Sequence, residues 1–374
     1  MFERGTTLRP RRIINRPAFL VHTAEIANHY APVWKELKDH PFDVLLRPGV
    51  TLPSQISLKG LPVRIRSVRT ALLLGERYKV LVSNHYQGYH DGKVRVPLTS
   101  FRIPFRKPAP AIKMLGVQNI RMLYAAGKLG WNMSDWNALY DGILCFGPRH
   151  ASLFKEKFGL PVFEMGYPRF DNYFNVPIDK ASVIASLGGN PDQKTIIWLP
   201  TWKKLSSVGH FNTEIADLVK SFNVIIKVHP LMVHDEPHRV NELSKLGLTA
   251  IIQDARDNIP LYQVADTMLF DYGGPPFGGI YTRKRFVLLN VPGASNDPWA
   301  GPDSSDIALR DVFRNVDPGS GKLQRLVEDD ESWVEHDDAC RTLSDVYFAP
   351  LQGTSAAAAA AAIRDRSWID DTKS

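Results

Sequence analysis

Short apolar stretches recur along the chain, and each is followed by a Gly/Pro turn or by an amphipathic stretch. Runs rich in β-branched residues and bounded by turn formers predict buried strands. Their alternation with helical stretches is typical of βαβ units around parallel sheets. Eleven strands are predicted, a number that suits two sheets better than one: 17–22, 42–46, 79–83, 119–124, 142–146, 161–165, 194–199, 223–228, 249–252, 266–270 and 285–290.

Helical periodicity fills several of the gaps between these strands, and such amphipathic helices would cover the faces of the sheets. The alanine run 356–362 predicts one more helix, with Thr354 or Ser355 as its N-cap. We expect this helix to pack across a domain junction rather than to form a low-complexity tail. The amphipathic helices are predicted at 24–39, 149–158, 212–221 and 236–246.

The chain has 374 residues, more than a single hydrophobic core usually serves. The turn-rich segment 166–177 separates two series of strands. We therefore predict an α/β fold of two domains. The polar stretch 293–306 predicts a long loop, either a functional lid or a mobile connection. The predicted units are 1–175, 176–345 and a C-terminal helix and tail at 346–374.

The chain is basic, with 46 Lys and Arg against 39 Asp and Glu and a net charge of +7. This charge favours polyanionic partners such as nucleotides or anionic lipid surfaces. Nucleic acid is disfavoured, because the basic residues do not alternate with aromatic ones in a recognisable module. The amino end fits either an anionic membrane surface or a solvated tail, since its first 17 residues hold one Glu and five Arg: Arg4, Arg9, Arg11, Arg12 and Arg16.

Only two cysteines occur, Cys145 and Cys340, without a C-x-x-C spacing, so neither a disulfide framework nor a zinc site is predicted. No apolar run reaches 18 residues, and 1–15 lacks the apolar core of a secretory signal. We expect a cytoplasmic protein that is either free or peripheral on the inner face of the cell membrane. No Asp-x-Asp motif or acidic cluster suggests a metal, so no metal and no cofactor is expected besides a nucleotide-linked donor.

Phosphate sites in open α/β folds lie at the carboxyl ends of strands. The strand in Lys194–Lys204 ends at Pro200 and delivers three polar or aromatic residues to that rim: Thr201, Trp202 and Lys203. A threonine hydroxyl can bond a phosphate oxygen, and a lysine can neutralise its charge. The alternative is a strand that leaves the core through a proline turn and becomes charged where it meets solvent.

A second strand end carries Lys227 and His229 on one face, and Pro230 stops the strand directly after the histidine. A protonated imidazole there could stabilise charge on a leaving phosphate; a structural hydrogen-bonding histidine is the alternative. A third strand runs into Asp271, Tyr272, Gly273 and Gly274. The paired glycines permit the positive φ of an anion-binding turn, although a plain glycine turn before a helix remains the other reading.

The order and spacing of these segments resemble the CDP-glycerol glycerophosphotransferase family of teichoic-acid and capsule synthesis. The segment before the predicted second domain is also similar to that family's Gly-x-Pro-Arg segment. The stretches that carry the resemblance are Gly166-Tyr-Pro-Arg169, Leu199-Pro-Thr-Trp-Lys203, Lys227-Val-His-Pro230, Ala265-Asp266, Asp271-Tyr-Gly-Gly274 and Lys284-Arg-Phe-Val-Leu-Leu289.

The resemblance implies two Rossmann-like domains facing a cleft, of the GT-B type, with the donor's cytidine and phosphates held mainly by the second. It implies that His229 contacts the donor phosphate and that Asp271 to Gly274 belong to the same pocket. Two departures stand out. The family's Ser-Ser is Gly273-Gly274 here, and its N-terminal His-Gly-Thr, which supplies the acceptor-activating base, aligns with Leu123-Tyr-Ala-Ala-Gly-Lys128.

Substitutes for that base are sought in two N-terminal stretches. The stretch 84–91 offers His90 as the catalytic candidate, beside His85 and Asp91, and 130–137 offers Asp135. The second stretch has the composition of a sugar- or polyol-binding loop, although tryptophans that pack in the core are the alternative. Its predicted acceptor-binding residues are Trp131, Asn132, Trp136 and Asn137.

The predicted activity is transfer of a glycerol-phosphate, polyol-phosphate or glycosyl group from a nucleotide-activated, CDP-linked donor. The acceptor is a hydroxyl of a surface glycan or a lipid-linked polymer. His229 would stabilise the leaving phosphate, and an N-terminal side chain would deprotonate the acceptor. Two alternatives stay open: a sugar-nucleotide epimerase of the same architecture, and a non-catalytic nucleotide-binding subunit, which the missing His-Gly-Thr favours.

Overall fold

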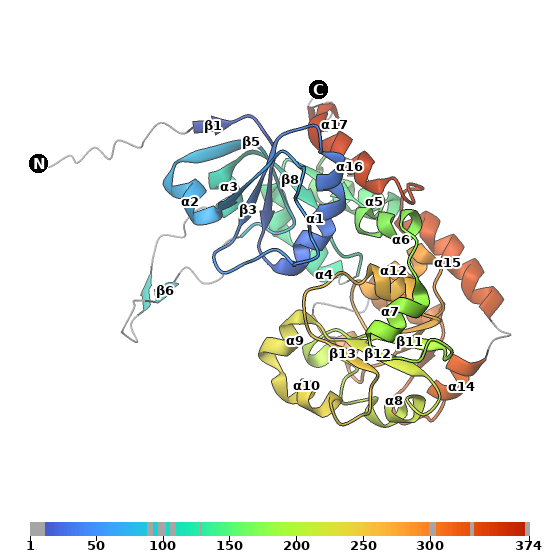
Figure 1. Cartoon of the computed structure of the whole chain (residues 1–374). Helices are drawn as coiled ribbons and strands as arrows, with labels where there is room; N and C mark the ends of the chain where they lie inside the picture. The colour runs from blue at the N-terminus through green and yellow to red at the C-terminus, as the bar shows by residue number, and fades with distance from the viewer. Residues whose placement is uncertain are drawn as a thin grey trace, which may run out of the picture.

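The computed structural model describes residues 12–87, 93–95, 102–104, 110–127, 129–298, 304–329 and 333–370. Two sheets of parallel strands dominate this part of the chain, one of eight strands and one of six. Each sheet forms the centre of one half of the molecule, and the two halves lie one above the other in Figure 1. The predicted two-sheet α/β architecture is therefore confirmed.

The first half is built on the sheet order β10-β9-β8-β5-β2-β3-β4, with β1 pairing to β5. Its strands are β1 (Arg12–Ile14), β2 (Ala18–Val21), β3 (Phe42–Leu46), β4 (Val63–Ser67), β5 (Glu76–Ser83), β8 (Gly116–Met122), β9 (Gly142–Cys145) and β10 (Val162–Glu164). Its helices include α1 (Ala24–Glu36), α2 (Val68–Leu73), α3 (Ala111–Leu115), α4 (Leu129–Asn132) and α5 (Pro148–Phe158). A separate antiparallel pair joins β6 (Lys93–Arg95) and β7 (Arg102–Pro104).

The centre of this half shows why its apolar runs become strands. All four residues of β2 are buried, because parallel strands are covered by helices on both faces. Helix α1 supplies part of that cover. Its Tyr30 and Trp34 rings pack on Phe19 of β2 with centroids 5.5 and 6.0 Å away.

The second half has the sheet order β13-β12-β11-β14-β15-β16. Its strands are β11 (Thr195–Leu199), β12 (Asn223–Lys227), β13 (Ala250–Ile252), β14 (Thr267–Phe270), β15 (Phe286–Leu289) and β16 (Asn315–Val316). Its helices include α7 (Lys180–Ser186), α8 (Asn212–Leu218), α9 (Pro230–Asp235), α10 (Pro237–Leu243), α11 (Ile259–Val264), α12 (Pro275–Thr282), α13 (Ser305–Ala308) and α14 (Leu323–Glu328). Short helix α6 (Asp171–Asn175) lies in the connection from the first half.

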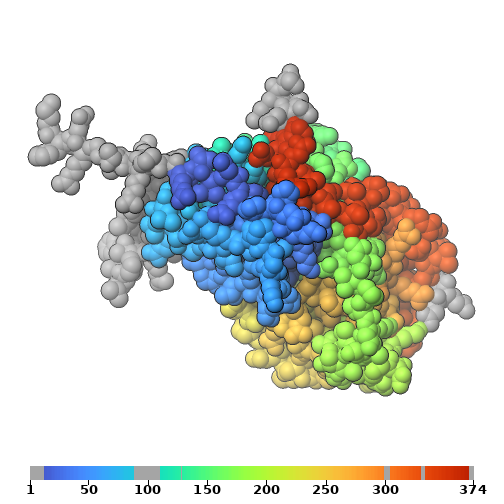
Figure 2. All heavy atoms as spheres, turned by 45° about the horizontal axis from the view of Figure 1, so that its top comes forward, coloured from blue at the N-terminus to red at the C-terminus, as the bar shows by residue number. Residues whose placement is uncertain are grey.

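The chain returns to the first half at its C-terminal end, through α15 (Val334–Tyr347), α16 (Ser355–Arg364) and α17 (Ser367–Asp370). These helices, red in Figure 2, lie along the first half and reach the second. Helix α16 packs across the junction as predicted, since the Ser355 hydroxyl meets both the Tyr167 N–H and the Tyr281 hydroxyl. Thr354 is the N-cap without a side-chain hydrogen bond; the Asp171 carboxylate accepts the first N–H groups instead.

All eleven predicted strands form, and so do the four predicted amphipathic helices. The described residues add five strands that the sequence pattern did not indicate, and each has two to five residues: β1, β4, β6, β7 and β16. The stretch 293–306, predicted as a loop, holds a 3-10 turn at Ala294–Asn296 and the start of α13. The polar side chains of Ser304 and Asp306 are buried, and residues 299–303 lie outside the described residues. The predicted domain limits remain a proposal.

Candidate active site

A cleft of about 800 Å³ lies between the two halves. It is lined by segments that follow β2, β8 and β10 in the first sheet and β11, β12 and β14 in the second. The carboxyl edges of the two sheets therefore face each other across it. The cleft brings together ten of the predicted site residues: Trp131, Asn132, Thr201, Trp202, Lys203, Lys227, His229, Tyr272, Gly273 and Gly274.

His229 is held by the start of helix α9. Its Nδ1 accepts a hydrogen bond from the Leu231 N–H at 3.2 Å and so caps the helix. The proton of a neutral ring then lies on Nε2, which makes that atom a donor. The ring also stacks on Trp202, with centroids 5.6 Å apart and an interplanar angle of 7°. A neutral imidazole in this orientation can donate to a phosphate without taking a second proton.

The segment after β11 forms the neighbouring wall. Lys203 has a positive φ of 59°, a conformation that non-glycine residues adopt rarely and often at functional sites. Its N–H donates to Glu236 at 2.8 Å, and its ammonium lies 4.0 Å from the centre of the Trp202 ring. The turn thus presents a cation and an aromatic face beside His229.

Asp271 lies behind the cleft and does not line it. Its carboxylate accepts the N–H groups of Thr201, Ser207 and Tyr272 at 2.7 to 2.8 Å, and the Ser207 hydroxyl at 2.9 Å. Burial raises the pKa of this carboxyl to about 6. We interpret Asp271 as the group that fixes the segments after β11 and β14 relative to each other, rather than as a direct phosphate ligand.

The glycine turn after β14 offers fewer N–H donors than its sequence suggests. Gly273 has a φ of 105°, as an anion-binding turn allows, but its N–H donates to the Asp306 carboxylate at 2.9 Å. The next two residues of helix α12, Pro275 and Pro276, have no N–H at all. The Gly274 N–H is the donor of this turn that remains for an anion in the cleft.

An ionic network crosses the cleft floor from the first half to the second. The buried Arg169 guanidinium pairs with Glu25 at 2.8 Å and with Asp257 at 2.9 Å. Its Nη1 also donates to His29 Nε2 at 2.8 Å. The Lys227 ammonium, almost entirely buried, lies 4.0 Å from Glu25 Oε2, and burial lowers the pKa of Lys227.

The predicted acceptor loop divides into two parts. Trp131 lines the cleft and stacks on His85 at 5.6 Å, and Asn132 lines it as well. Trp136 and Asn137 do not line the cleft. They hold the buried Arg121 guanidinium, which lies 4.4 Å from the centre of the Trp136 ring and donates to the Asn137 side chain.

Of the predicted bases, Asp135 and His85 lie within the described residues, and neither lines the cleft. The Asp135 side chain is 96% exposed, pairs with Lys157 at 3.4 Å and does not line it. His90 and Asp91 lie outside the described residues. His85 Nδ1 accepts the Gln87 N–H at 3.1 Å. The cleft residues of the first half that the sequence interpretation did not assign to the site include Glu25, His29, Tyr124 and Arg169.

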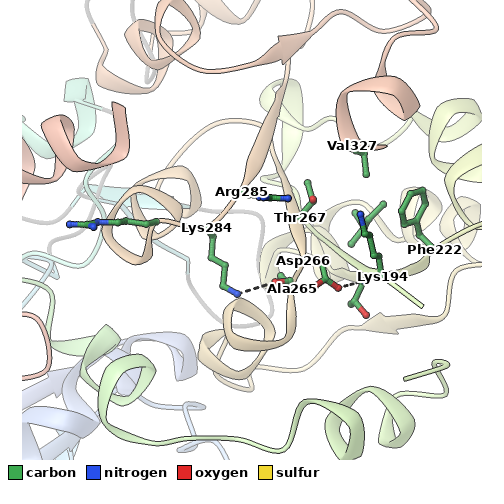
Figure 3. Close-up of a pocket in the computed structure, with 11 residues that line it drawn as sticks. Lys194, Phe222, Ala265, Asp266, Thr267, Lys284, Arg285 and Val327 are labelled. Carbon is green, nitrogen blue, oxygen red and sulfur yellow. Dashed lines mark hydrogen bonds between the residues drawn. The ribbon is translucent and has the colours of Figure 1, made fainter. Parts of the chain in front are cut away.

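A second hollow, of about 330 Å³, lies at the opposite edge of the second sheet, where its strands begin (Figure 3). Basic residues dominate its lining. Its Lys284 ammonium donates to the Ala265 carbonyl at 2.9 Å, and burial lowers the pKa of Lys284 to about 8. None of the predicted site residues lines this hollow.

The described ranges contain no group of three or more His, Cys, Asp or Glu side chains placed to hold a metal ion. Among their helices, none combines the length and the apolar character needed to cross a bilayer.

Comparison with solved structures shows the same fold in proteins of low sequence identity. A CDPG-soaked variant of the wall teichoic acid polymerase TagF matches with a TM-score of 0.64 and 13% identity over 96% of this chain and 90% of that one. Anabaena Alr3699/HepE, in complex with UDP and glucose, matches with a TM-score of 0.55 and 10% identity over 93% of this chain and 98% of that one. The S. aureus MnaA–UDP structure matches with a TM-score of 0.53 and 12% identity over 91% of this chain and 94% of that one.

No curated protein matches the sequence. The sequence model of one family, CDP-glycerol:poly(glycerophosphate) glycerophosphotransferase, matches residues 23–278. This match covers more than half of the chain and includes both walls of the cleft. With its two facing parallel sheets, the chain is a transferase of GT-B-like architecture and belongs to the CDP-glycerol:poly(glycerophosphate) glycerophosphotransferase family.

Proposed function

We propose that this chain transfers glycerol phosphate from CDP-glycerol to a hydroxyl of a poly(glycerol phosphate) or related surface-glycan acceptor. One observation carries the proposal: His229, Lys227 and the Gly273-Gly274 turn converge on one cleft between the halves. A cleft of about 800 Å³ has the size of a nucleotide site. The family match and the CDPG-soaked TagF structure support CDP-glycerol as the donor.

The donor's phosphates would lie against the second half. The Lys227 ammonium and the Nε2–H of His229 are the charged and neutral donors of this wall, and the Gly274 N–H adds a backbone donor. In the reaction, the acceptor oxygen attacks the phosphorus that carries glycerol, and CMP leaves. Donors already placed around the growing negative charge lower the barrier, because they need no rearrangement as the reaction proceeds.

The acceptor would lie against the first half. The half-buried Trp131 lines the cleft and can stack on the C–H groups of a polyol, and the Asn132 side chain is fixed nearby. Asn132 donates to the carbonyls of Ala125 and Gly127 at 2.8 and 2.9 Å. We keep a glycan or lipid-linked polymer as the acceptor class.

Membrane attachment through the basic amino end, on the inner face of the cell membrane, is a further part of this proposal. Most of that segment lies outside the described residues. Of its five arginines, Arg16 pairs with the buried Asp43 at 2.9 Å and serves the fold. The others would supply the attraction to anionic lipid.

The test is to replace His229 by Ala in the full chain and to measure CMP release from CDP-glycerol with a short poly(glycerol phosphate) primer. We expect turnover to fall about 10²- to 10³-fold, the loss typical of one preorganised donor. The cost in stability should be about 1 kcal/mol, for the lost cap of α9. His234→Ala, an exposed histidine of the same helix, is the matched control.

Unchanged turnover in H229A would remove this mechanism. UDP-linked donors belong in the same assay, since HepE and MnaA were solved with UDP. Conversion of a UDP-sugar without any acceptor would support the epimerase alternative. Calorimetric binding of CDP-glycerol with no product from any acceptor would support the non-catalytic one.

A further inference from the structure

The transfer reaction needs a group that takes the proton of the acceptor hydroxyl, and the family motif that supplies it is missing here. The aligned loop at Tyr124 to Gly127 packs directly on the Gly273-Gly274 turn and offers no histidine. Within the described part of the first half, the side chains that line the cleft and could exchange a proton are Glu25, His29, Tyr124 and Tyr167. Burial raises the pKa of Tyr167 to about 12, so its hydroxyl stays protonated at neutral pH.

His29 cannot take this proton. Its Nε2 accepts a hydrogen bond from the Arg169 guanidinium, and arginine has no other role than donor. The ring proton of neutral His29 therefore lies on Nδ1, and the lone pair of Nε2 is occupied by Arg169. Neither nitrogen can accept the proton of an acceptor hydroxyl. Burial also lowers the pKa of His29 well below its ordinary value.

Tyr124 fails for the opposite reason. Burial raises the pKa of its hydroxyl above the ordinary value of 10, so the hydroxyl stays protonated at neutral pH. It can donate a hydrogen bond but does not supply a basic oxygen.

Glu25 has the position and the free lone pairs that the step requires. It lies in the first turn of α1, directly after β2, with a side chain that is 23% exposed and lines the cleft. Its Oε1 is held by Arg169 at 2.8 Å. Its Oε2 accepts a long hydrogen bond from Asn28 at 3.3 Å and lies 4.0 Å from the Lys227 ammonium.

The two cations give this carboxylate a second property. A negative group beside the donor's phosphates would normally repel them. Arg169 and Lys227 balance the charge of Glu25, so carboxylate and phosphate can share the cleft. If the Lys227 ammonium binds the donor phosphate, as proposed above, Glu25 Oε2 lies beside that phosphate, since it is 4.0 Å from the ammonium.

We infer that Glu25 is the general base that activates the acceptor hydroxyl in this chain. This inference rests on the proposed glycerophosphotransferase function. The Glu25 carboxylate takes the hydroxyl proton while the acceptor oxygen forms its bond to the phosphorus. The bond from that phosphorus to the CMP oxygen breaks, and CMP leaves with the electron pair. The protonated Glu25 then returns its proton to water.

Asp257 provides a matched control for the structural role of Glu25. Asp257 also pairs with Arg169, at 2.9 Å, but its side chain does not line the cleft and so cannot contact a substrate there. If Glu25 served only to hold Arg169, Glu25→Gln and Asp257→Asn should have similar effects. If Glu25 accepts the proton, only Glu25→Gln should lose turnover.

The experiment measures kcat and KM for CMP release from CDP-glycerol with a poly(glycerol phosphate) primer, and CDP-glycerol binding by calorimetry. For E25Q we expect kcat to fall by about 10²- to 10⁴-fold, the range of general-base catalysis. Donor affinity should stay equal or rise, because a negative charge beside the phosphates is removed. D257N should keep kcat within about fivefold of the wild type, and formate should restore part of the turnover of E25A by replacing the missing carboxylate.

Three results would overturn the role of Glu25: an E25Q rate within fivefold of the wild type, an equal loss in D257N, or a parallel loss of donor binding in E25Q. The last would place the carboxylate in the donor site. Failure of the proposed function has a different signature, because the wild-type chain itself would then bind no CDP-glycerol or release no CMP.

Discussion

The two halves pack closely at Gly127, and we predict that Gly127→Ala disrupts both stability and turnover. Gly127 follows β8 and lines the cleft. A Cβ added there would lie 2.3 Å from the carbonyl oxygen of Gly273 and 2.7 Å from its carbonyl carbon. Both atoms are backbone of the opposite half, so no side chain can rotate away to relieve the clash.

The size of the effect follows from these distances. Ordinary Cβ contacts begin near 3.4 Å, so the Gly127 and Gly273 segments must move apart by about 1 Å. Overpacking of this kind costs about 1 to 3 kcal/mol. The displaced segments carry the donor turn and the acceptor loop, and a misplacement of about 1 Å reduces turnover by about 10²-fold.

Urea unfolding and CMP release from CDP-glycerol measure the two effects. Gly274→Ala is the matched control, because its φ of −77° is ordinary and the added Cβ meets only the Ala125 side chain, at 3.3 Å. We expect G274A to stay within about 1 kcal/mol of the wild type. A G127A variant with wild-type stability and turnover would refute the close packing of the two halves in this region.

Two other predictions follow from the glycine turn and from buried ionisable groups. Gly274→Ser restores one hydroxyl of the family's Ser-Ser pair at an ordinary φ, so calorimetry should show CDP-glycerol bound a few times more tightly. Stability to urea should fall as the pH drops from 6.5 to 4, by about 1.4 kcal/mol per unit for each buried imidazole. Burial lowers the pKa of these imidazoles to about 4, so the unfolded chain takes protons that the folded chain refuses. Equal stability at pH 7 and pH 5 would contradict this. These imidazoles belong to His22, His150 and His336. Two carboxyls, Asp171 and Asp271, have a pKa raised to about 6, so the folded chain binds their protons more readily than the unfolded chain does. Below pH 6 they therefore add stability and offset part of the loss.

The strands and helices could be predicted from the sequence because apolar runs and turn-forming residues are local signals. The run Val224-Ile-Ile226 is buried throughout, as in a strand that is covered on both faces, and Pro230 stops this strand directly after His229. The same reasoning placed Lys227, His229 and Thr201 at the carboxyl edge of the sheet, where they line the cleft. The edge strand Val63–Ser67 was not predicted, because its apolar residues alternate with arginines and do not form the continuous apolar run by which the other strands were recognised.

The site could be predicted only in part, because partners distant in sequence decide what a side chain does. Trp136 and Asn137 have the composition of a polyol-binding loop, yet both are taken up by Arg121 from a neighbouring strand. Nothing near Glu25 in the sequence indicates its partner Arg169, which is 144 positions away. Functional side chains in such folds lie at the carboxyl ends of parallel strands. That rule identified residues of the second sheet, and it applies equally to the end of β2, where Glu25 lies.

The glycine turn shows how this chain can keep a phosphate site while departing from its family's motif. Gly273-Gly274 lacks the two hydroxyls of Ser-Ser, Asp306 occupies the Gly273 N–H, and the following prolines remove two further donors. The hydrogen-bond donors that this wall still offers to a phosphate are mostly side chains, above all the Lys227 ammonium and the His229 imidazole. An ammonium in so buried a site requires a nearby negative charge. In the absence of donor Glu25 supplies that charge, and the same carboxylate is thereby held where an acceptor hydroxyl must lose its proton.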